Sequence, residues 1–527
     1  MGLGNRYSQH SFAMTPAVHS PRSVFDRSFT KKDTFYFDQL MPIFVDEILP
    51  GDTCNLNVST FGRLSTQVVP LMDNAYVDFF FFFVPNRLVW TNWEKFNGAQ
   101  TNPGDSISYT VPQMTAPAVT GFIANSIADH FGLPTEIASI NVNALPFRGL
   151  ALIWNQWFRD QNLQDSITVN TGDGPDLYTA YAYDATFCKK HDYFTSCLPW
   201  PQKGTALNIP VTGAASTVTL VPHTTSTAAM LSRNAGTGAL SPATTGVSTK
   251  ITTGNLINDG DSYNMVIDPN ARLTVTPLMT GTINDLRLAF QVQTLLEIDA
   301  RGGTRYVEIL LAHWNVVSPD FRLQRPEFLG SSTITINSHP VPQTSATSGS
   351  NYQGKLASFG TLASQGGHIG FSKSFVEHGF VIGLMRARGE ITYQQGINRM
   401  WSRSTRYDYF WPALQDIGEQ AVLKQELSAS GGTAVFGYQE RYAEYRYKPS
   451  EICGEFRSNF ATPLDSWHLA QDLAGSTLND DFITSDTPIE RNLASVSNAN
   501  LLMDFFFNYK HARVMKTYSV PASLGRL

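Results

Sequence analysis

The apolar residues of this chain occur in short runs separated by Pro, Gly, Asn and Asp. One run, YVDFFFFFVPN at residues 76–86, places five consecutive phenylalanines between an aspartate and a proline. Its apolar segment, residues 79–84, is much shorter than the roughly 20 residues that a membrane-spanning helix requires. Phenylalanines without polar alternation are typical of a strand covered on both faces, so we predict a fully buried strand that ends at Pro85.

A second phenylalanine run, LLMDFFFNYK at residues 501–510, also has an acidic residue followed by phenylalanines. It predicts a second strand of the same kind, far from the first in sequence. We expect the two strands to lie in one core, although periodicity alone leaves their pairing open.

From residue 36 onward, short apolar stretches alternate with turn signals. MPIFVDEILPGDT at residues 41–53 and CNLNVSTFGRL at residues 54–64 are examples. Such spacing predicts an antiparallel β-sandwich. Residues 1–35 have no periodicity and predict an extended basic arm, so residues 36–202 are expected to hold the first part of the core.

Two regions add helices to this mainly β chain. Residues 145–163 predict an inserted amphipathic helix with a proline in its first turn. Residues 283–314 predict two helices divided by a Gly-Gly pair and capped by Asn284 and Thr304. We expect the remaining strands and a basic C-terminal tail to complete residues 283–527.

Residues 203–282 differ in composition from the rest of the chain. Between residues 204 and 258, Arg233 and Lys250 are the only charged residues, and most others are Thr, Ser, Ala, Gly or Pro. Disordered segments usually carry more charge, and alternation near residue 219 is consistent with short strands. We predict an exposed, sparsely ordered insertion that makes external contacts.

Charge is scarce and unevenly distributed over the 527 residues. Charged residues make up 16% of the chain, compared with about 25% in soluble proteins, while aromatics reach 12%. This composition is typical of extensive subunit interfaces, although one large uncharged globule is an alternative. Residues 1–32 and 508–527 each sum to +4 within a chain of −6, which leaves −14 for residues 33–507. The basic ends predict contact with phosphate, and simple solvation is the alternative.

No residue pattern supports catalysis. The sequence has no Walker loop, nucleophile elbow or zincin helix. We interpret His313 as a core histidine, and Asp465, His468 and Asp472 as polar neighbours in sequence. The four cysteines are too few and scattered for a disulfide framework and lack the spacing of a metal site, so we expect reduced thiols and no cofactor.

Arginines alternate with aromatic residues in RMWSRSTRYDYFWPAL, residues 399–414. This mixture suits single-stranded nucleic acid, through phosphate contacts and base stacking. It also suits the energetic centre of a protein interface, which we favour. The subunit-interface candidates are Arg399, Trp401, Arg403, Arg406, Tyr407, Tyr409 and Trp411.

Long segments distributed over nearly the whole chain carry a family resemblance. They are RSVFDRSF (22–29), PIFVDEILPGDTCNLN (42–57), FFFFVPNRLVWTNW (80–93), HDYFTSCLPWPQKG (191–204), ARGGTRYVEIL (300–310), RLQRPEFLG (322–330), TYQQGINRMWSRSTRYDYFWPALQDIGEQAV (392–422) and FGYQERYAEYRYKPSEICGEFRS (436–458). Together they resemble the major capsid protein of gokushoviruses, which are small single-stranded DNA phages of the Microviridae. The resemblance weakens at residues 205–280.

The resemblance implies an eight-stranded antiparallel viral jelly roll with long loop insertions. It also implies a T=1 icosahedral shell, built through pentamers around circular single-stranded DNA and assembled in the cytoplasm of a bacterial host. The variable insertion would form a protrusion at the threefold axes that meets a host receptor. A scaffold protein and a small basic DNA-packing protein are further expected partners, because a subunit of net charge −6 cannot balance a genome.

The charged residues then provide site candidates. The DNA-facing candidates are Arg6, Arg22, Arg27, Lys31, Lys32, Arg513 and Lys516, and the host-contact candidates are His223, Arg233 and Lys250. Two other classes remain as alternatives. A secreted β-sandwich adhesin or carbohydrate-binding protein would explain the Thr-rich insertion, but residues 1–32 lack the apolar segment of a secretory signal. A polysaccharide-degrading enzyme would need paired carboxylates in a cleft.

Overall fold

The protein is described by a computed structural model covering residues 21–183, 185–204, 283–302, 306–315, 324–349, 352–364, 369–496 and 498–518, together with the backbone of seven short strands between residues 219 and 274. The chain divides into two compact units. The first comprises Met1–Pro201 and Gly302–Leu527, and the second comprises Gln202–Arg301.

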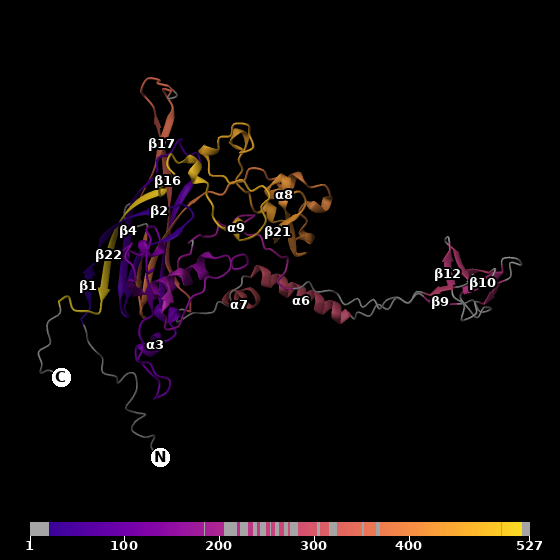
Figure 1. Ribbon diagram of the computed structural model, residues 1–527, viewed down its shortest axis with the longest axis horizontal. Helices are drawn as coiled ribbons and strands as arrows, with labels where there is room; N and C mark the ends of the chain where they lie inside the picture. The colour runs from indigo at the N-terminus through magenta and orange to yellow at the C-terminus, as the bar shows by residue number, and fades with distance from the viewer. Residues whose placement is uncertain are drawn as a thin grey trace, which may run out of the picture. The chain divides into compact units, whose positions relative to one another are not determined.

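The first unit is built on an antiparallel sheet of ten strands (Figure 1). They are β1 (Ser23–Asp26), β2 (Phe29–Phe35), β3 (Leu40–Ile48), β4 (Thr53–Leu64), β5 (Ala75–Pro85), β16 (Glu327–Pro342), β17 (Leu356–Ser364), β18 (Gly370–Ser374), β19 (Gly379–Gly389) and β22 (Leu501–Arg513). Their hydrogen-bonded order is β1-β22-β4-β17-β16-β5-β19-β3, while β2 also pairs with β22 and β18 also pairs with β4.

Two positions in this sheet are each shared by two strands. Along β22, residues 501–507 pair with β2 and residues 510–513 pair with β1. Along β4, residues 53–57 pair with β18 and residues 60–63 pair with β17. The ten strands therefore occupy eight positions across the sheet.

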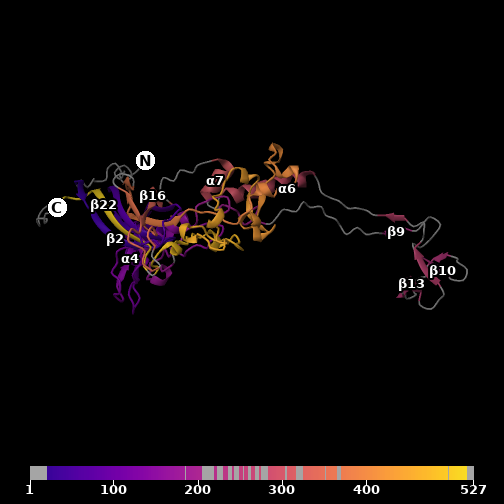
Figure 2. The same ribbon diagram turned by 90° about the horizontal axis from the view of Figure 1, so that it is seen from above.

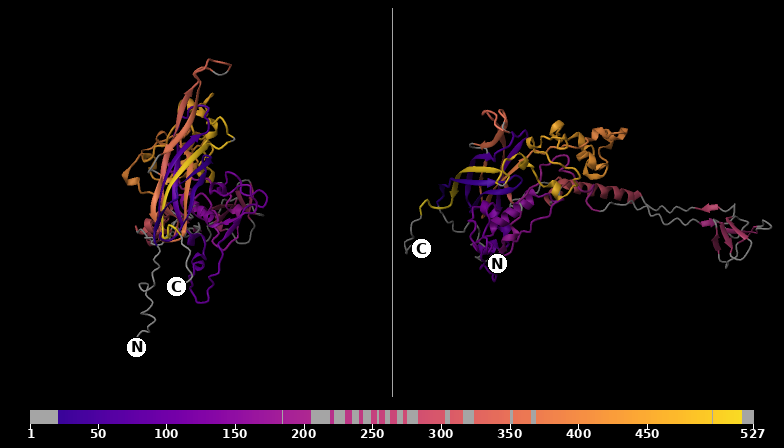
Figure 3. Two further views of the ribbon diagram at one scale, coloured as in Figure 1. Left: turned by 90° about the vertical axis from the view of Figure 1, so that its left-hand side faces the viewer. Right: turned by 45° about the horizontal axis from the view of Figure 1, so that its top comes forward.

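The sheet curls so that its two halves face one another. β16 connects the halves, because its first part pairs with β5 and residues 337–342 pair with β17. Phe79 of β5 lies 6.4 Å from Phe505 of β22 between ring centroids, although these strands are not hydrogen-bonded neighbours. The predicted antiparallel jelly roll is therefore confirmed, and the β16–β17 hairpin projects beyond the other strands (Figure 3).

β5 is buried on both faces, as its sequence predicts. Phe79, Phe81 and Phe83 are at most 2% exposed, and their rings contact Phe505 of β22, Phe371 of β18 and Phe375 just after β18. Phe80 and Phe82 point the other way, against the inserted helix. The run of phenylalanines therefore joins the sandwich core to the layer that covers it.

β22 alternates between buried and exposed residues, which its phenylalanine run does not predict. Phe505 and Phe507 are fully buried, whereas Phe506 is 46% exposed. Among the described residues of this unit, nothing covers the outer side of Phe506, so the expectation of a second strand buried on both faces is wrong. The expectation that both strands share one core is confirmed by the contact between Phe79 and Phe505.

The inserted helix consists of α5 (Leu145–Ile153) and the π-helical turn η2 (Trp154–Phe158). It ends at Phe158 and not at residue 163, because Asp160 begins a turn. The Asp160 carboxylate accepts hydrogen bonds from the backbone amides of Asn162 and Leu163 at 2.8 and 3.2 Å.

The other helices of the first unit are short. They are α2 (Asn86–Val89), α3 (Trp93–Phe96), α4 (Ile127–His130), α7 (Tyr306–Trp314), α8 (Lys424–Leu427) and α9 (Asp480–Ile483). The 3-10 turns are η3 (Tyr178–Ala180), η4 (Arg399–Trp401), η5 (Arg406–Asp408), η6 (Pro412–Leu414), η7 (Ala429–Gly431), η8 (Ala443–Tyr445), η9 (Gly454–Phe456), η10 (Asp465–Trp467) and η11 (Ile489–Asn492). Two small sheets are formed by β20 (Glu419–Leu423) with β21 (Val435–Glu440), and by β7 (Asn141–Asn143), β6 (Gln113–Thr115) and β8 (Asp176–Leu177).

The first unit has a second, smaller core beside the sandwich. It packs β20 and β21 against residues near 193 and 393. Its buried members are Tyr193, Phe194, Cys197, Tyr393, Val422, Leu427, Phe436, Ala443 and Phe482.

The second unit contains the predicted insertion, residues 203–282, and α6 (Ile283–Arg301). Five strands form an antiparallel sheet in the order β11 (Leu240–Pro242), β10 (Met230–Asn234), β14 (Tyr263–Ile267), β13 (Asn255–Asn258) and β12 (Thr249–Thr252). β9 (Thr219–Val221) pairs with β15 (Arg272–Thr274), and Figure 2 shows these short strands from above. The two predicted helices are present as α6 and α7, which belong to different units.

The N-terminal region is part of the sheet from Ser23 onward, since β1 and β2 both pair with β22. Within the expected extended basic arm, residues 1–35, the two strands β1 and β2 are therefore added to the edge of the sheet. Residues 1–20 lie outside the described part of the chain.

Candidate subunit interface and charged chain ends

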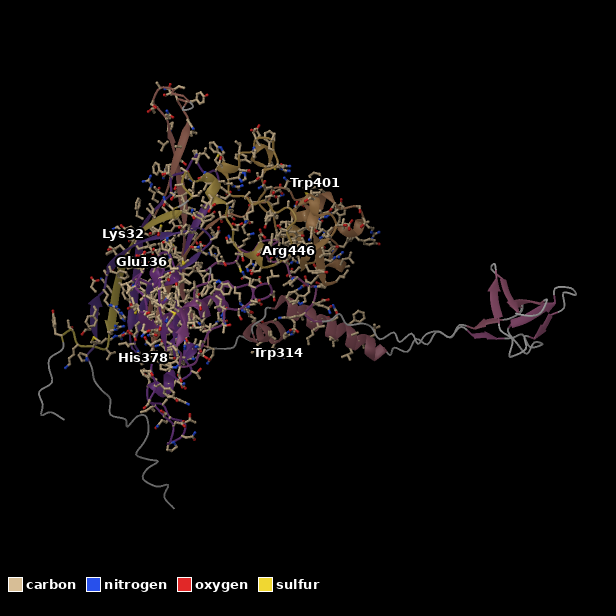
Figure 4. All side chains as sticks on the ribbon, in the orientation of Figure 1. Lys32, Glu136, Trp314, His378, Trp401 and Arg446 are labelled. Carbon is tan, nitrogen blue, oxygen red and sulfur yellow. The ribbon has the colours of Figure 1, made fainter. Side chains whose placement is uncertain are left out.

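The segment that contains η4, η5 and η6 exposes a group of large apolar side chains, which we call the aromatic surface. Three consecutive 3-10 turns keep this segment outside the second core, so its rings face solvent in the isolated chain. Figure 4 labels Trp401 here and Lys32 on a distant part of the same unit. The aromatic surface comprises Met400, Trp401, Tyr407, Tyr409, Phe410, Trp411 and Tyr445, all at least 45% exposed.

Arginines hold the rings of the aromatic surface in place. The guanidinium carbon of Arg403 lies 4.3 Å from the ring centroid of Tyr445 and 5.3 Å from that of Tyr409. That of Arg406 lies 5.1 Å from the ring of Tyr407. Such contacts stabilise the rings in fixed orientations, so the surface is organised before any partner arrives.

Two of the three arginines are neutralised by buried glutamates. Arg399 contacts Glu426 at 3.2 Å, and Arg403 contacts Glu444 at 3.1 Å. Burial raises the pKa of Glu426, although Arg399 and a 2.9 Å hydrogen bond from the hydroxyl of Tyr193 favour its charged form. These pairs connect the aromatic surface to the second core and leave little positive charge available for phosphate.

The subunit-interface candidates are therefore brought together, but in different roles. The tryptophans and tyrosines are exposed on the aromatic surface, and Arg406 has no carboxylate partner among the described residues. Arg403 lies against the rings of Tyr409 and Tyr445, and Arg399 is tied to Glu426 and to the carbonyl oxygen of Ala421. The sequence missed Glu426 and Glu444, because their arginine partners are far away along the chain.

Basic residues near the first and last strands of the sheet form a partly buried network with carboxylates, which the sequence did not predict. We call it the end network: Arg27, Asp46, Asp52, Tyr509, His511 and Arg513. Arg27 Nη2 donates to Asp46 Oδ1 at 2.8 Å, and Arg513 Nη2 donates to Asp52 Oδ2 at 2.9 Å. Arg27 and Arg513, both DNA-facing candidates, thus have carboxylate partners within the fold.

His511 lies at the centre of the end network and is fully buried. Its Nε2 is 2.8 Å from Asp52 Oδ2, and its Nδ1 is 3.1 Å from Arg27 Nη1. Burial lowers the pKa of His511, and Arg513 acts in the same direction. Asp52 has a lowered pKa because hydrogen bonds from Arg513 and His511 outweigh the effect of burial.

The other DNA-facing candidates divide by exposure. Lys31 is largely buried: its Nζ donates to the carbonyl oxygen of His130 at 2.6 Å and pairs with Asp33 at 3.0 Å. Burial lowers the pKa of Lys31, and Asp33 opposes this. Lys32 is exposed, at 3.8 Å from Asp504. Arg22 and Lys516 are also exposed, and Arg6 lies outside the described residues.

The period-two pattern of β22 could have revealed part of the end network. Leu501, Met503, Phe505, Phe507, Tyr509 and His511 all point into the sandwich. The alternation continues past the phenylalanines into polar residues, so two polar side chains were predictable at buried positions.

The host-contact candidates lie in the second unit. Arg233 is on β10 and Lys250 is on β12, and β14 and β13 separate these strands within the sheet. Their side chains lie outside the described residues, as does His223.

The polar clusters show no arrangement for metal or catalysis in the described part of the chain. No group of three His, Cys, Asp or Glu side chains there is placed to hold a metal ion. His468 contacts Asp465 at 3.5 Å, and His313 packs beside Trp314 at 5.7 Å between ring centroids. All four cysteines are free. No described helix has the length and apolar character to cross a membrane.

A jelly roll with a preformed, exposed aromatic surface defines a structural subunit that is built to associate. Comparison with known proteins identifies which one. The chain belongs to the capsid protein (F protein) family, whose model matches residues 13–523. It is thus a major capsid protein and a component of the virion.

Relatives of this chain span its whole length. It is 54% identical to the capsid protein VP1 of Bdellovibrio phage phiMH2K, with 100% of both chains covered. It is 40% identical to capsid protein VP1 of Chlamydia phage 1 and 36% identical to that of Spiroplasma virus 4, with 97% of each chain covered. The predicted resemblance to gokushovirus capsid proteins is confirmed.

Proposed function

We propose that copies of this chain associate through the aromatic surface into a T=1 icosahedral shell, built from pentamers, that encloses circular single-stranded DNA. The observation that carries this proposal is the exposure of the aromatic surface on an organised support. The role is structural and not catalytic. Closed symmetry lets many modest contacts stabilise a container without open-ended aggregation.

The chemistry of the aromatic surface favours a protein partner over nucleic acid. Single-stranded DNA would need several free cations beside the rings. Arg399 and Arg403 already have glutamate partners, which leaves Arg406 as the arginine of this segment without a carboxylate partner among the described residues. Burying a large apolar side chain contributes about 1.5–3 kcal/mol, and aromatic residues are enriched among the residues that dominate interface energies. A neighbouring copy of the chain is therefore the partner that suits this surface.

The second unit, with Arg233 and Lys250 on its strands and His223 before both in sequence, is our candidate for contact with a host receptor. Its residues between 204 and 258 are nearly free of charge, which suits an exposed surface that makes external contacts. A small basic protein or polyamines in the shell would supply the positive charge that a subunit of net charge −6 lacks. A scaffold protein is a further proposed partner in assembly.

The experiment is electron microscopy with light scattering on the chain expressed in bacteria, alone and with its scaffold and DNA-packing partners. We expect closed shells or pentamers from the wild type and a large loss of both from Trp401→Ala/Tyr407→Ala. Tyr352→Ala is the matched control, because Tyr352 is also exposed but lies on the β16–β17 hairpin side of the unit. Shells of normal yield from the double variant would overturn the assigned interface. A wild-type chain that stayed monomeric with all partners would overturn the assembly itself.

A further inference from the structure

The first strand, β1, and the end of the last strand, β22, meet at one corner of the sheet. β1 pairs with the end of β22, with Ser23 opposite Arg513. The hydroxyl of Thr517 donates to the hydroxyl of Ser23 at 3.1 Å, and Arg22 donates to the hydroxyl of Thr53. Residues 22–26 and 510–518 therefore share one surface, which we call the terminal corner, and Figure 1 shows β1 beside β22.

Positive charge accumulates at the terminal corner. Arg22, Lys510 and Lys516 are exposed there. Lys510 lies opposite Asp26 across the β1–β22 pair and interacts with its carboxylate, so Arg22 and Lys516 carry most of the uncompensated charge. The adjoining carboxylates Asp46 and Asp52 are already used by the end network. Asp26 and Glu47 offset part of this charge. The sequence beyond the corner adds Arg6 and Arg526 and no acidic residue, in a chain whose net charge is −6.

An exposed aromatic ring accompanies these cations. Tyr518 is 83% exposed and lies two residues from Lys516. Val24 and Met515 are also exposed at the corner, so the surface is apolar as well as basic. A ring beside cations is the arrangement that binds unpaired bases by stacking and their phosphates by charge, independently of base sequence.

The end network makes the terminal corner rigid. Arg27 holds the link between β1 and β2 to β3 through Asp46, and Arg513 holds the end of β22 to the turn before β4 through Asp52. The backbone positions of Arg22 and Lys516 relative to one another are thus constrained by the Arg27–Asp46 and Arg513–Asp52 pairs. Preorganised cations lose less entropy when a ligand binds.

We infer that the terminal corner is a composite binding site for single-stranded DNA, in which Arg22, Lys510 and Lys516 contact phosphates and Tyr518 stacks on a base. This assignment rests on the proposed function of enclosing single-stranded DNA. It differs from the simple expectation of two separate basic tails, because neither end alone supplies the site.

The test measures binding of a fluorescent oligothymidylate to the full, unassembled chain by anisotropy at increasing salt. The variants are Arg22→Gln/Lys516→Gln and Tyr518→Ala, and the matched control is Lys190→Gln/Lys355→Gln, which removes two exposed charges elsewhere. Loss of two phosphate contacts should reduce the slope of log K against log salt by about 1.4. Tyr518→Ala should weaken binding about tenfold with little change in that slope. The control should behave as the wild type.

A composite site requires both Arg22, just before β1, and Lys516, in the segment after β22. Arg22→Gln and Lys516→Gln should each lower the affinity for the oligothymidylate. Arg22→Lys/Lys516→Arg, which keeps both positive charges, should bind with nearly the affinity of the wild type. An unchanged salt slope in the double glutamine variant would overturn the site. So would normal DNA binding combined with loss of shells, which would make the corner a contact between subunits. Electron microscopy of the wild-type chain separates these results from failure of the proposed function: wild-type shells together with an unchanged salt slope in the double glutamine variant would reject the site alone, whereas a wild-type chain that forms no shells would reject the proposed function.

Discussion

The hydroxyl of Tyr509 on β22 donates a 2.8 Å hydrogen bond to Asp46 Oδ2 on β3, and so joins the two halves of the sandwich at the end of the chain. Burial raises the pKa of Tyr509, so the phenol keeps its proton and remains a donor. The same carboxylate pairs with Arg27. Asp46 of β3 therefore joins Tyr509 of β22, the last strand, to Arg27 near the start of the sheet.

Tyr509→Phe should lower the free energy of unfolding by about 1–2 kcal/mol, because a buried carboxylate loses one donor but keeps Arg27. Urea unfolding of the unassembled chain measures this. Tyr409→Phe, the same change on the aromatic surface, should have almost no effect. Equal effects from both variants would show that the contact between Tyr509 and Asp46 contributes nothing specific.

The alternation of β22 provides a second prediction. Phe505→Ala should cost about 3–5 kcal/mol of unfolding free energy, since it leaves a cavity in the sandwich core. Phe506→Ala, one residue along the same strand, should cost about 0.5 kcal/mol or less in the unassembled chain. Circular dichroism during urea titration distinguishes the two. Similar losses would mean that the outer face of β22 is also packed within the subunit.

Much of the fold was predictable because it depends on local patterns. The phenylalanines of β5 have no polar alternation, and the strand is buried on both faces. The run in β22 looked similar, but Phe506 is exposed on the outer face of the strand, so three consecutive phenylalanines concealed the period of two at that point.

The charged residues were less predictable, because the position of an arginine in the sequence does not reveal which carboxylate it pairs with in the fold. Arg27 and Arg513 resemble DNA-binding cations in a basic tail, yet their partners Asp46 and Asp52 lie elsewhere in the chain. The aromatic surface was predictable as a cluster, since its residues are close in sequence. Its glutamate supports were not.

His511 predicts how stability depends on pH. Burial lowers its pKa below the ordinary value of 6.5, so the unfolded chain takes up a proton at a higher pH than the folded chain does. The stability contributed by neutral His511 is therefore fully present above pH 6.5 and is lost as the pH falls through the lowered pKa. Asp52 remains ionised in this range because its pKa is also lowered.

Urea unfolding at several pH values on both sides of 6.5 would test this for the wild type and His511→Gln. The wild type should lose stability more steeply on acidification than the variant, which has no proton to take up at this position. Parallel pH profiles would show that other groups, such as His468, cause the loss. Burial lowers the pKa of His468 as well, so His468→Gln is the matched comparison.

The cysteines provide a prediction about chemical reactivity. Burial raises the pKa of Cys54 to about 11 and that of Cys188 to about 12, so neither forms a thiolate readily at neutral pH. Cys197 is buried, whereas Cys453 is exposed. An aromatic disulfide reagent should therefore react rapidly with one thiol of the folded chain at neutral pH, and slowly with the other three. Cys453→Ser should remove the rapid phase and leave the slow phase unchanged. A rapid phase that survives in this variant would mean that one of the other three thiols is reached by opening of the fold. Cys188 is only partly buried, so Cys188→Ser would then show whether its contact with Gln164 is the site that opens.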